Sequence, residues 1–187
     1  MLLFGHMGLT LAAARMVERV WSSRTGRAFI GLDYRLVLLG SMLPDILDKP
    51  LGGVILRESL GNGRIYGHTL AFLLVLLGWG WWLWFRFRRP GGLTLAGASG
   101  LHQFLDGMWH TPETSLWPAY GLGFPKGHPE GWFELWLRNL TSDPLVYIPE
   151  IAGGAVLLLF FWDLTCRKGL AGFIRTGRIR PAPREES

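Results

Sequence analysis

Residues 68–85 read HTLAFLLVLLGWGWWLWF and contain no Lys, Arg, Asp or Glu. A helix needs about 20 mainly apolar residues to cross the hydrocarbon core of a bilayer, so this stretch predicts a transmembrane helix. A second apolar run covers residues 145–164 and is interrupted by Pro149 and Glu150. Only 18% of the chain is charged, against about 25% in typical soluble proteins. The sequence therefore predicts an all-α polytopic membrane protein.

Other apolar segments predict further helices on both sides of this one. We expect a bundle of about five transmembrane helices, at residues 2–21, 28–47, 68–85, 93–109 and 145–164. Residues 1–166 would form one helical domain, in which 49–67 is a Gly-rich loop and 110–143 is a long outer loop with a short interfacial helix at 131–140. Residues 167–187 would form a basic cytoplasmic tail.

The positions of the basic residues predict the orientation. Of 19 Lys and Arg residues, 14 fall in the two connections after the first and third spans, at the ends of those spans, or in the tail. Lys and Arg accumulate on the cytoplasmic side of membrane proteins. We therefore expect a multi-pass protein of the cytoplasmic (inner) membrane, with its N-terminus outside and its C-terminus in the cytoplasm.

Composition also excludes several classes of site. The net charge of +5 comes from residues that flank apolar spans, so we expect no nucleic-acid partner. Cys166 is the only cysteine, which excludes an internal disulfide and a thiolate metal site. No basic residue precedes the apolar start of the chain, which argues against a cleaved signal peptide and predicts that His6 is retained.

Residues able to bind a metal occur at the ends of four expected spans, all at the outer face in this topology. They are His6, Asp45, Asp48, His68, His102, Asp106 and His110. His102, Asp106 and His110 are four residues apart, so a continuous helix would carry all three on one face. Alternatively, His102 and Asp106 form only a hydrogen-bonded pair within the helix. The convergence of the four ends favours a metal site.

Imidazole and carboxylate ligands without thiolate suit Zn²⁺, with Mn²⁺ or Fe²⁺ as alternatives. The number of candidate ligands allows one or two ions, and two ions about 3.5–4 Å apart are common in phosphoester hydrolysis. Each residue also has a simpler interpretation. Asp45 after a proline is typical of a helix cap, a terminal His6 is often solvated, and His110 with Glu113 also fits a helix stop.

Several motifs resemble the YdjM-like family of inner-membrane metal-dependent hydrolases, and more distantly the zinc-dependent phospholipase C and single-strand nuclease superfamily. They are GH at residues 5–6, GSMLPDILD at 40–48, GHT at 67–69, HQFLD at 102–106 and LWP at 116–118. The resemblance implies that Asp45, His68, His102 and Asp106 form the main metal site and that His6 contributes to a further one. Two departures are that Asp45 and Asp48 are one residue further apart than in the family pattern, and that Gly63 replaces a histidine.

By this resemblance the leading hypothesis is a membrane-embedded hydrolase that cleaves a phosphoester of a lipid or lipid-linked substrate with a metal-activated water. Asp48 and His110 are the predicted catalytic residues. Asp48, or a metal-bound hydroxide, would act as the base, and His110 would substitute for the family histidine that Gly63 replaces. Arg64 would bind a phosphate or face lipid headgroups. Membrane lipids are the expected partners. The alternative is a non-catalytic membrane interaction protein braced by a metal; a transporter is disfavoured because residues 68–85 supply no charged group.

Overall fold

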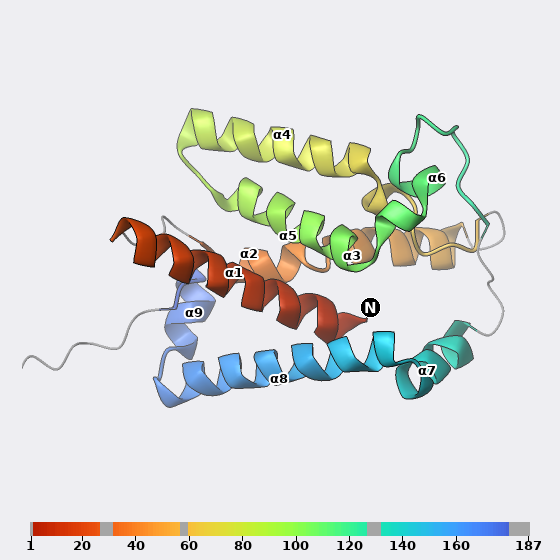
Figure 1. Ribbon diagram of the computed structural model, residues 1–187. Helices are drawn as coiled ribbons and strands as arrows, with labels where there is room; N and C mark the ends of the chain where they lie inside the picture. Colours follow the sequence, from red (N-terminus) through yellow and green to blue (C-terminus); the bar gives the residue numbers. More distant parts are fainter. Residues whose placement is uncertain (1, 27–31, 57–59, 127–131, 180–187) are drawn as a thin grey trace, which may run out of the picture.

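The longest helices of the molecule lie alongside one another, as Figure 1 shows. They are α1 (Leu3–Thr25), α4 (Leu70–Phe87), α5 (Gly91–Leu105) and α8 (Pro144–Cys166). The structure is a computed structural model that describes residues 2–26, 32–56, 60–126 and 132–179, without the side chains of 132–136. Within these ranges the chain contains helices and no strand, so the predicted all-α class is confirmed.

Shorter elements close the two ends of this bundle. They are α2 (Tyr34–Gly40), α3 (Leu43–Pro50), a π-helical turn (Leu51–Ile55), a 3-10 turn (Tyr66–His68), a second 3-10 turn (Met108–His110), α6 (Pro112–Ser115), α7 (Trp132–Ser142) and α9 (Leu170–Thr176). In Figure 1, α3, α6 and α7 lie at the end that holds the N-terminus, and α9 lies at the other. The helix expected at 131–140 corresponds to α7, and α9 adds a helix to the expected tail.

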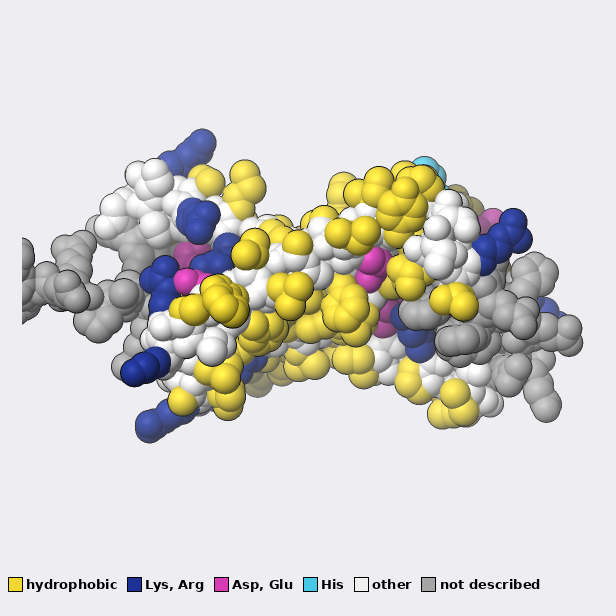
Figure 2. Space-filling view, turned by 90° about the horizontal axis from the view of Figure 1, so that it is seen from below, with side chains coloured by type: hydrophobic (Ala, Val, Ile, Leu, Met, Phe, Trp, Pro, Cys, Tyr) yellow, Lys and Arg dark blue, Asp and Glu magenta, His cyan; other side chains and the backbone are white. Residues whose placement is uncertain are grey.

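Two helices are long and apolar enough to cross a membrane, namely α4 and α8. Both expose large apolar side chains, such as Val75 at 73% and Trp162 at 71%. Figure 2 shows apolar side chains over the middle of one face, with Lys and Arg gathered toward the two ends. Such a distribution suits a protein surrounded by lipid. The five-span arrangement stays a prediction.

Glycines allow α1 and α8 to touch through their backbones. A Cβ atom built on Gly8 would lie 2.1 Å from the Gly153 carbonyl oxygen, so only glycine permits this approach. Nearby, the buried Glu150 carboxylate of α8 accepts hydrogen bonds from the backbone N–H groups of Leu2, Phe4 and Gly5 at 2.7–3.0 Å. These N–H groups have no partner within α1, so Glu150 caps the helix that carries His6.

The second expected span is not one helix. The described part breaks at Ser41 and Met42 into α2 and α3, and residues 27–31 lie outside the described residues. The reason is Pro44, which has no N–H to donate to the carbonyl of Gly40. That carbonyl accepts a hydrogen bond from the Ser99 hydroxyl of α5 at 2.9 Å instead. The break thus ties α2 and α3 to α5.

The fourth expected span also ends earlier than predicted. α5 stops at Leu105, and Gly107 takes a left-handed conformation with φ of 66° that turns the chain. Asp106 is therefore the C-terminal cap residue of α5, and His110 belongs to the following 3-10 turn. The prediction that His102, Asp106 and His110 share one helical face was wrong for His110.

Candidate metal centre

Four side chains from three separate segments meet at the N-terminal end of the bundle. Nε2 of His68 lies 3.2 Å from Nε2 of His102, 3.7 Å from Asp45 Oδ1 and 3.7 Å from Asp106 Oδ2. Nε2 of His102 lies 3.9 Å from the same oxygen of Asp45 and 4.0 Å from that of Asp106. Asp45, His68 and His102 are buried. Asp106 is partly buried as a whole residue, but its side chain is only 3% exposed.

These separations are close to those of a tetrahedral ligand shell. With Zn–ligand bonds of about 2.0–2.1 Å, neighbouring ligand atoms in a tetrahedron are about 3.3 Å apart. The five distances given above, of 3.2–4.0 Å, are equal to this or slightly larger. Asp45 groups most closely with His68 and His102, and Asp106 with His6 and His102. We call Asp45, His68, His102 and Asp106 the four-ligand cluster.

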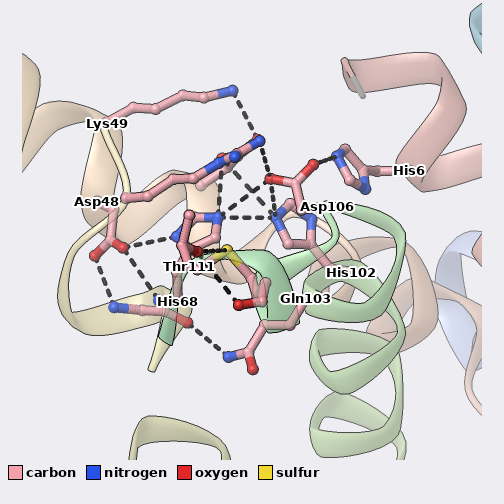
Figure 3. Close-up of polar contacts among 12 residues, drawn as sticks. His6, Asp48, Lys49, His68, His102, Gln103, Asp106 and Thr111 are labelled. Atoms are coloured by element: carbon pink, nitrogen blue, oxygen red, sulfur yellow. Dashed lines mark hydrogen bonds and ion pairs between the residues drawn. The ribbon is translucent and has the colours of Figure 1, made fainter. Parts of the chain in front are cut away.

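Hydrogen bonds at the far side of each imidazole fix its orientation, as Figure 3 shows for His68. Nδ1 of His68 lies 2.7 Å from Oδ2 of Asp48, and Nδ1 of His102 lies 2.6 Å from the carbonyl oxygen of Ser41. Both partners are acceptors, so both Nδ1 atoms carry the proton and donate it. Each Nε2 is then left with a lone pair aimed at the other, an arrangement that a cation or a shared proton between them makes favourable.

Asp48 is completely buried and does not point into the four-ligand cluster. Its carboxylate accepts hydrogen bonds from the backbone N–H groups of Ile65, Gly67 and His68 at 2.7, 2.7 and 3.2 Å. Together with His68 Nδ1, these donors occupy both oxygens. The arrangement is that of a carboxylate that orients a metal-binding histidine.

His6 lies on the opposite side of His102 from His68. Its ring stacks on the His102 ring with centroids 4.0 Å apart, and its Nε2 lies 3.0 Å from Asp106 Oδ1. His6 is fully buried, and among the described residues neither ring nitrogen makes a hydrogen bond of good geometry. A buried polar group without such a bond is costly. His6 with His102 and Asp106 thus forms a second group suited to a cation.

Two cations lie at the rim of the four-ligand cluster. Lys49 Nζ contacts Asp45 Oδ2 at 2.7 Å, and an Arg64 guanidinium nitrogen contacts Asp106 Oδ2 at 2.8 Å. Both side chains are about half exposed, at 57% and 43%. Burial alone would raise the pKa of Asp106, but contacts with His6 and His68 and the charge of Arg64 hold that pKa well below its usual range. These contacts favour the ionised form of Asp106.

The sequence prediction and the structure differ in what surrounds the cluster. The structure brings His6, Asp45, His68, His102 and Asp106 together and places Asp48 behind His68. It leaves His110 exposed and outside both ligand groups, where Nε2 of His110 accepts a hydrogen bond from the Trp109 indole. The fifth histidine of the chain, His128 in the expected outer loop, lies outside the described residues.

Sequence reasoning missed Lys49, Ser41 and Gln103. The Gln103 amide donates hydrogen bonds to the carbonyl oxygens of Gly67 and Thr69 at 3.0 and 3.2 Å, which holds the turn that carries His68 against α5. A signal was present, because Ser99, His102, Gln103 and Asp106 fall on adjacent polar positions of an otherwise apolar helix. For Lys49, the spacing of four residues from Asp45 was the available signal.

The fold and the site define an all-helical membrane protein with a buried His/Asp cluster at one end of its helices. The profile of the YdjM inner membrane protein family matches residues 1–171, and the chain belongs to this family. Its membrane location agrees with the two apolar helices. No curated protein and no solved structure matches the chain.

Proposed function

We propose that the protein is a metal-dependent hydrolase of the inner membrane that cleaves a phosphoester of a lipid or lipid-linked substrate. The observation that carries the proposal is the pair of Nε2 atoms at 3.2 Å, both with their lone pairs directed inward by Asp48 and Ser41. A bound proton could satisfy this pair alone. Two carboxylate oxygens at 3.7–4.0 Å complete a set that suits a divalent cation, for which zinc is the first candidate and Mn²⁺ or Fe²⁺ are alternatives.

The concentration of carboxylates supports the same assignment. The side chains of Asp45, Asp48 and Asp106 are at least 90% buried, and Lys49 and Arg64 contact Asp45 and Asp106 from the rim. Buried carboxylates are costly unless they are paired or bind a metal. His6 beside Asp106 Oδ1 could extend the site toward a second ion.

The chain's own residues would divide the work of hydrolysis. Asp45, His68, His102 and Asp106 would hold the metal, which supplies Lewis acidity and a bound water of near-neutral pKa. Lys49 and Arg64 would bind the phosphate oxygens at the rim, since guanidinium and ammonium groups both pair with phosphate. Asp48 would keep His68 in the metal-binding tautomer. The roles of Asp48 as a base and of His110 in catalysis stay predictions, and His110→Ala tests the latter.

The membrane arrangement belongs to the proposal as well. With the N-terminus outside and the C-terminus in the cytoplasm, the four-ligand cluster would lie at headgroup depth on the outer side. A lipid phosphate rests at this depth, and the apolar surface of the helices would give it lateral access.

The cluster also favours a second candidate, a non-catalytic protein whose metal braces the helix ends. Four protein ligands fill a tetrahedral shell, which is typical of structural zinc, whereas catalysis needs an open or fifth position. The exposed Lys49 and Arg64 at the rim, which can pair with phosphate oxygens, favour the hydrolase.

Elemental analysis and hydrolysis assays on the same purified samples test both candidates. We expect the wild type to carry about one or two metal ions per chain, and His102→Ala and His68→Ala to lose most of the main-site metal. His102→Ala should also lose hydrolysis of phosphatidic acid or other phospholipids. Negligible metal in all samples after metal-replete purification would contradict both candidates. Bound metal without any phosphoester hydrolysis would support the brace.

A further inference from the structure

An apolar groove of about 920 Å³ lies between α1, α2, the second half of α4 and α5. Its lining includes Thr10, Val17, Trp84, Leu93, Gly97 and Leu101. The other lining residues are apolar apart from Thr94 and the indole N–H groups of Trp21 and Trp81, and none of them is charged. A cavity with such a lining holds hydrocarbon more readily than water.

One end of the groove lies one helical turn or less, along α1 and α5, from residues of the candidate metal centre. Thr10 follows His6 by one turn of α1, and Leu101 is the neighbour of His102 on α5. The other end lies at Trp21 and Pro90, near the end of the bundle where α4 passes into α5. The groove thus runs along the helices from the cluster toward the opposite end.

Thr10 marks the end beside the cluster with a polar group in need of a partner. Its residue is 2% exposed, and its hydroxyl makes no hydrogen bond within the described part of the chain. Threonine in a helix usually satisfies its hydroxyl on the carbonyl one turn earlier. An unsatisfied buried hydroxyl costs about 1–3 kcal/mol. The hydroxyl oxygen itself is buried, and a rotation of the side chain toward the groove would let a carbonyl or ether oxygen of a ligand accept this hydrogen bond.

The dimensions of the groove fit a lipid chain. Thr10 and Trp21 are eleven residues apart on one helix, a distance of about 16 Å. One leaflet contributes about 15 Å of the hydrocarbon core. Spread over this length, 920 Å³ corresponds to a channel at least about 9 Å wide, which admits a hydrocarbon chain. Since the surrounding medium is lipid in the proposed membrane arrangement, a hydrocarbon chain is the occupant that the apolar lining favours.

We propose that the groove binds one hydrocarbon chain of a membrane lipid, with the polar end of that lipid at Thr10 beside the four-ligand cluster. This inference rests on the proposed function insofar as the same lipid is the substrate. It deepens that function by naming the substrate class, a lipid with an acyl or prenyl chain. The chain in the groove would hold the phosphate of the lipid at the four-ligand cluster.

Photo-crosslinking in reconstituted vesicles tests the proposal. The wild-type protein is placed in phosphatidylcholine vesicles that contain phosphatidic acid with a diazirine either next to the ester or at the chain end, and labelled peptides are mapped. We expect the first probe to label the region of Thr10 and Leu101. The second should label the region of Trp21 and Leu93. The reversed order would mean that a lipid of the other leaflet occupies the groove, and would overturn the proposal.

A matched pair of glycine variants tests whether the groove is the site. A Cβ atom at Gly97 meets nothing within 4 Å, so Gly97→Phe projects into the groove without a backbone clash. Gly78 of α4 also has open space around its Cβ position but does not line the groove. We expect Gly97→Phe to reduce groove labelling at least tenfold and Gly78→Phe to leave it unchanged. Uniform labelling of the exposed apolar helices, insensitive to Gly97→Phe, would overturn the proposal.

The failure of this inference and that of the proposed function give different results. Chain binding does not require the metal, so His102→Ala should retain groove labelling while losing hydrolysis. Groove labelling in a wild type that carries no metal and hydrolyses nothing would reject the hydrolase alone. Hydrolysis of phosphatidic acid without groove labelling would reject the chain site alone. If Gly97→Phe fails to fold, two results still test the chain site. They are the labelling of Gly97→Leu and the positions that the two diazirine probes label in the wild type.

Discussion

Asp48 and His68 form a fully buried pair in which the carboxylate lies 2.7 Å from Nδ1 of the imidazole. The carboxylate comes from α3 and the imidazole from the turn before α4, so the pair also connects two segments of the chain. The same carboxylate binds three backbone N–H groups of residues 65–68. Its removal should therefore affect both the orientation of His68 and the path of the backbone.

We expect Asp48→Asn to lower the affinity for the bound metal about 10–100-fold, the usual effect of losing a carboxylate that orients a metal-binding histidine. Asp48→Ala should in addition lower thermal stability, because buried N–H groups lose their acceptors. Metal titration monitored by calorimetry checks the affinity. Asp163→Asn is the matched control. Asp163 lies near the C-terminal end of α8, away from the cluster, and contacts Arg167, so this variant should bind metal as the wild type does. Equal affinities for all three variants would contradict the role of Asp48.

Gly8 should be intolerant of a side chain. Gly8→Ala places a Cβ atom 2.1 Å from the backbone of Gly153 and forces α1 away from α8. Overpacking of this kind costs about 1–3 kcal/mol or more, and α1 carries His6. Gly154→Ala is the control, since its Cβ would meet nothing within 4 Å. We expect a lower melting temperature in detergent for Gly8→Ala and no loss for Gly154→Ala; similar losses in both would contradict the packing argument.

Glu150 should contribute to stability as the cap of α1. Glu150→Ala removes the acceptor of three backbone N–H groups, and each hydrogen bond to a charged group contributes about 1.5–3 kcal/mol. Glu150→Gln should fall between the wild type and the alanine variant, because its amide retains one acceptor oxygen. Thermal denaturation followed by tryptophan fluorescence ranks the variants. Glu113→Gln, at an exposed residue of α6, should melt as the wild type does.

Arg64 should affect substrate binding more than metal binding. Its guanidinium lies at the rim, 43% exposed, and contacts only the carboxylate of Asp106 among the cluster residues. We expect Arg64→Gln to raise KM for an anionic phosphoester about 10–100-fold while the metal content stays near that of the wild type. Arg138→Gln, at an exposed position of α7, is the control. Loss of the metal in Arg64→Gln would show that Arg64 is structural.

Local patterns, namely apolar runs with polar residues at their ends, were sufficient to predict the helical class and seven candidate ligands. The choice of Asp45, His68, His102 and Asp106 among them came from the resemblance to the YdjM-like family. The sequence was not sufficient where tertiary contacts decide. Pro44 can be read from the sequence. The break that it causes is stabilised by the Ser99 hydroxyl of α5, which donates a hydrogen bond to the carbonyl oxygen of Gly40. The end of α5 depends on the left-handed Gly107, which removes His110 from the face of His102. The position of Glu150 against the start of α1 is likewise a contact between opposite ends of the chain.

The interruption between α2 and α3 means that the proposed metal binding depends on a break in regular secondary structure. In an unbroken helix the carbonyl oxygen of Ser41 would accept a backbone hydrogen bond within that helix. His102 would then lose the acceptor of its Nδ1–H, which fixes its tautomer. Raising helix propensity around Pro44 should therefore make this segment more regular and the centre less able to hold an ion. At Pro44, a regular helix and the geometry of the candidate centre therefore make opposite demands on the backbone.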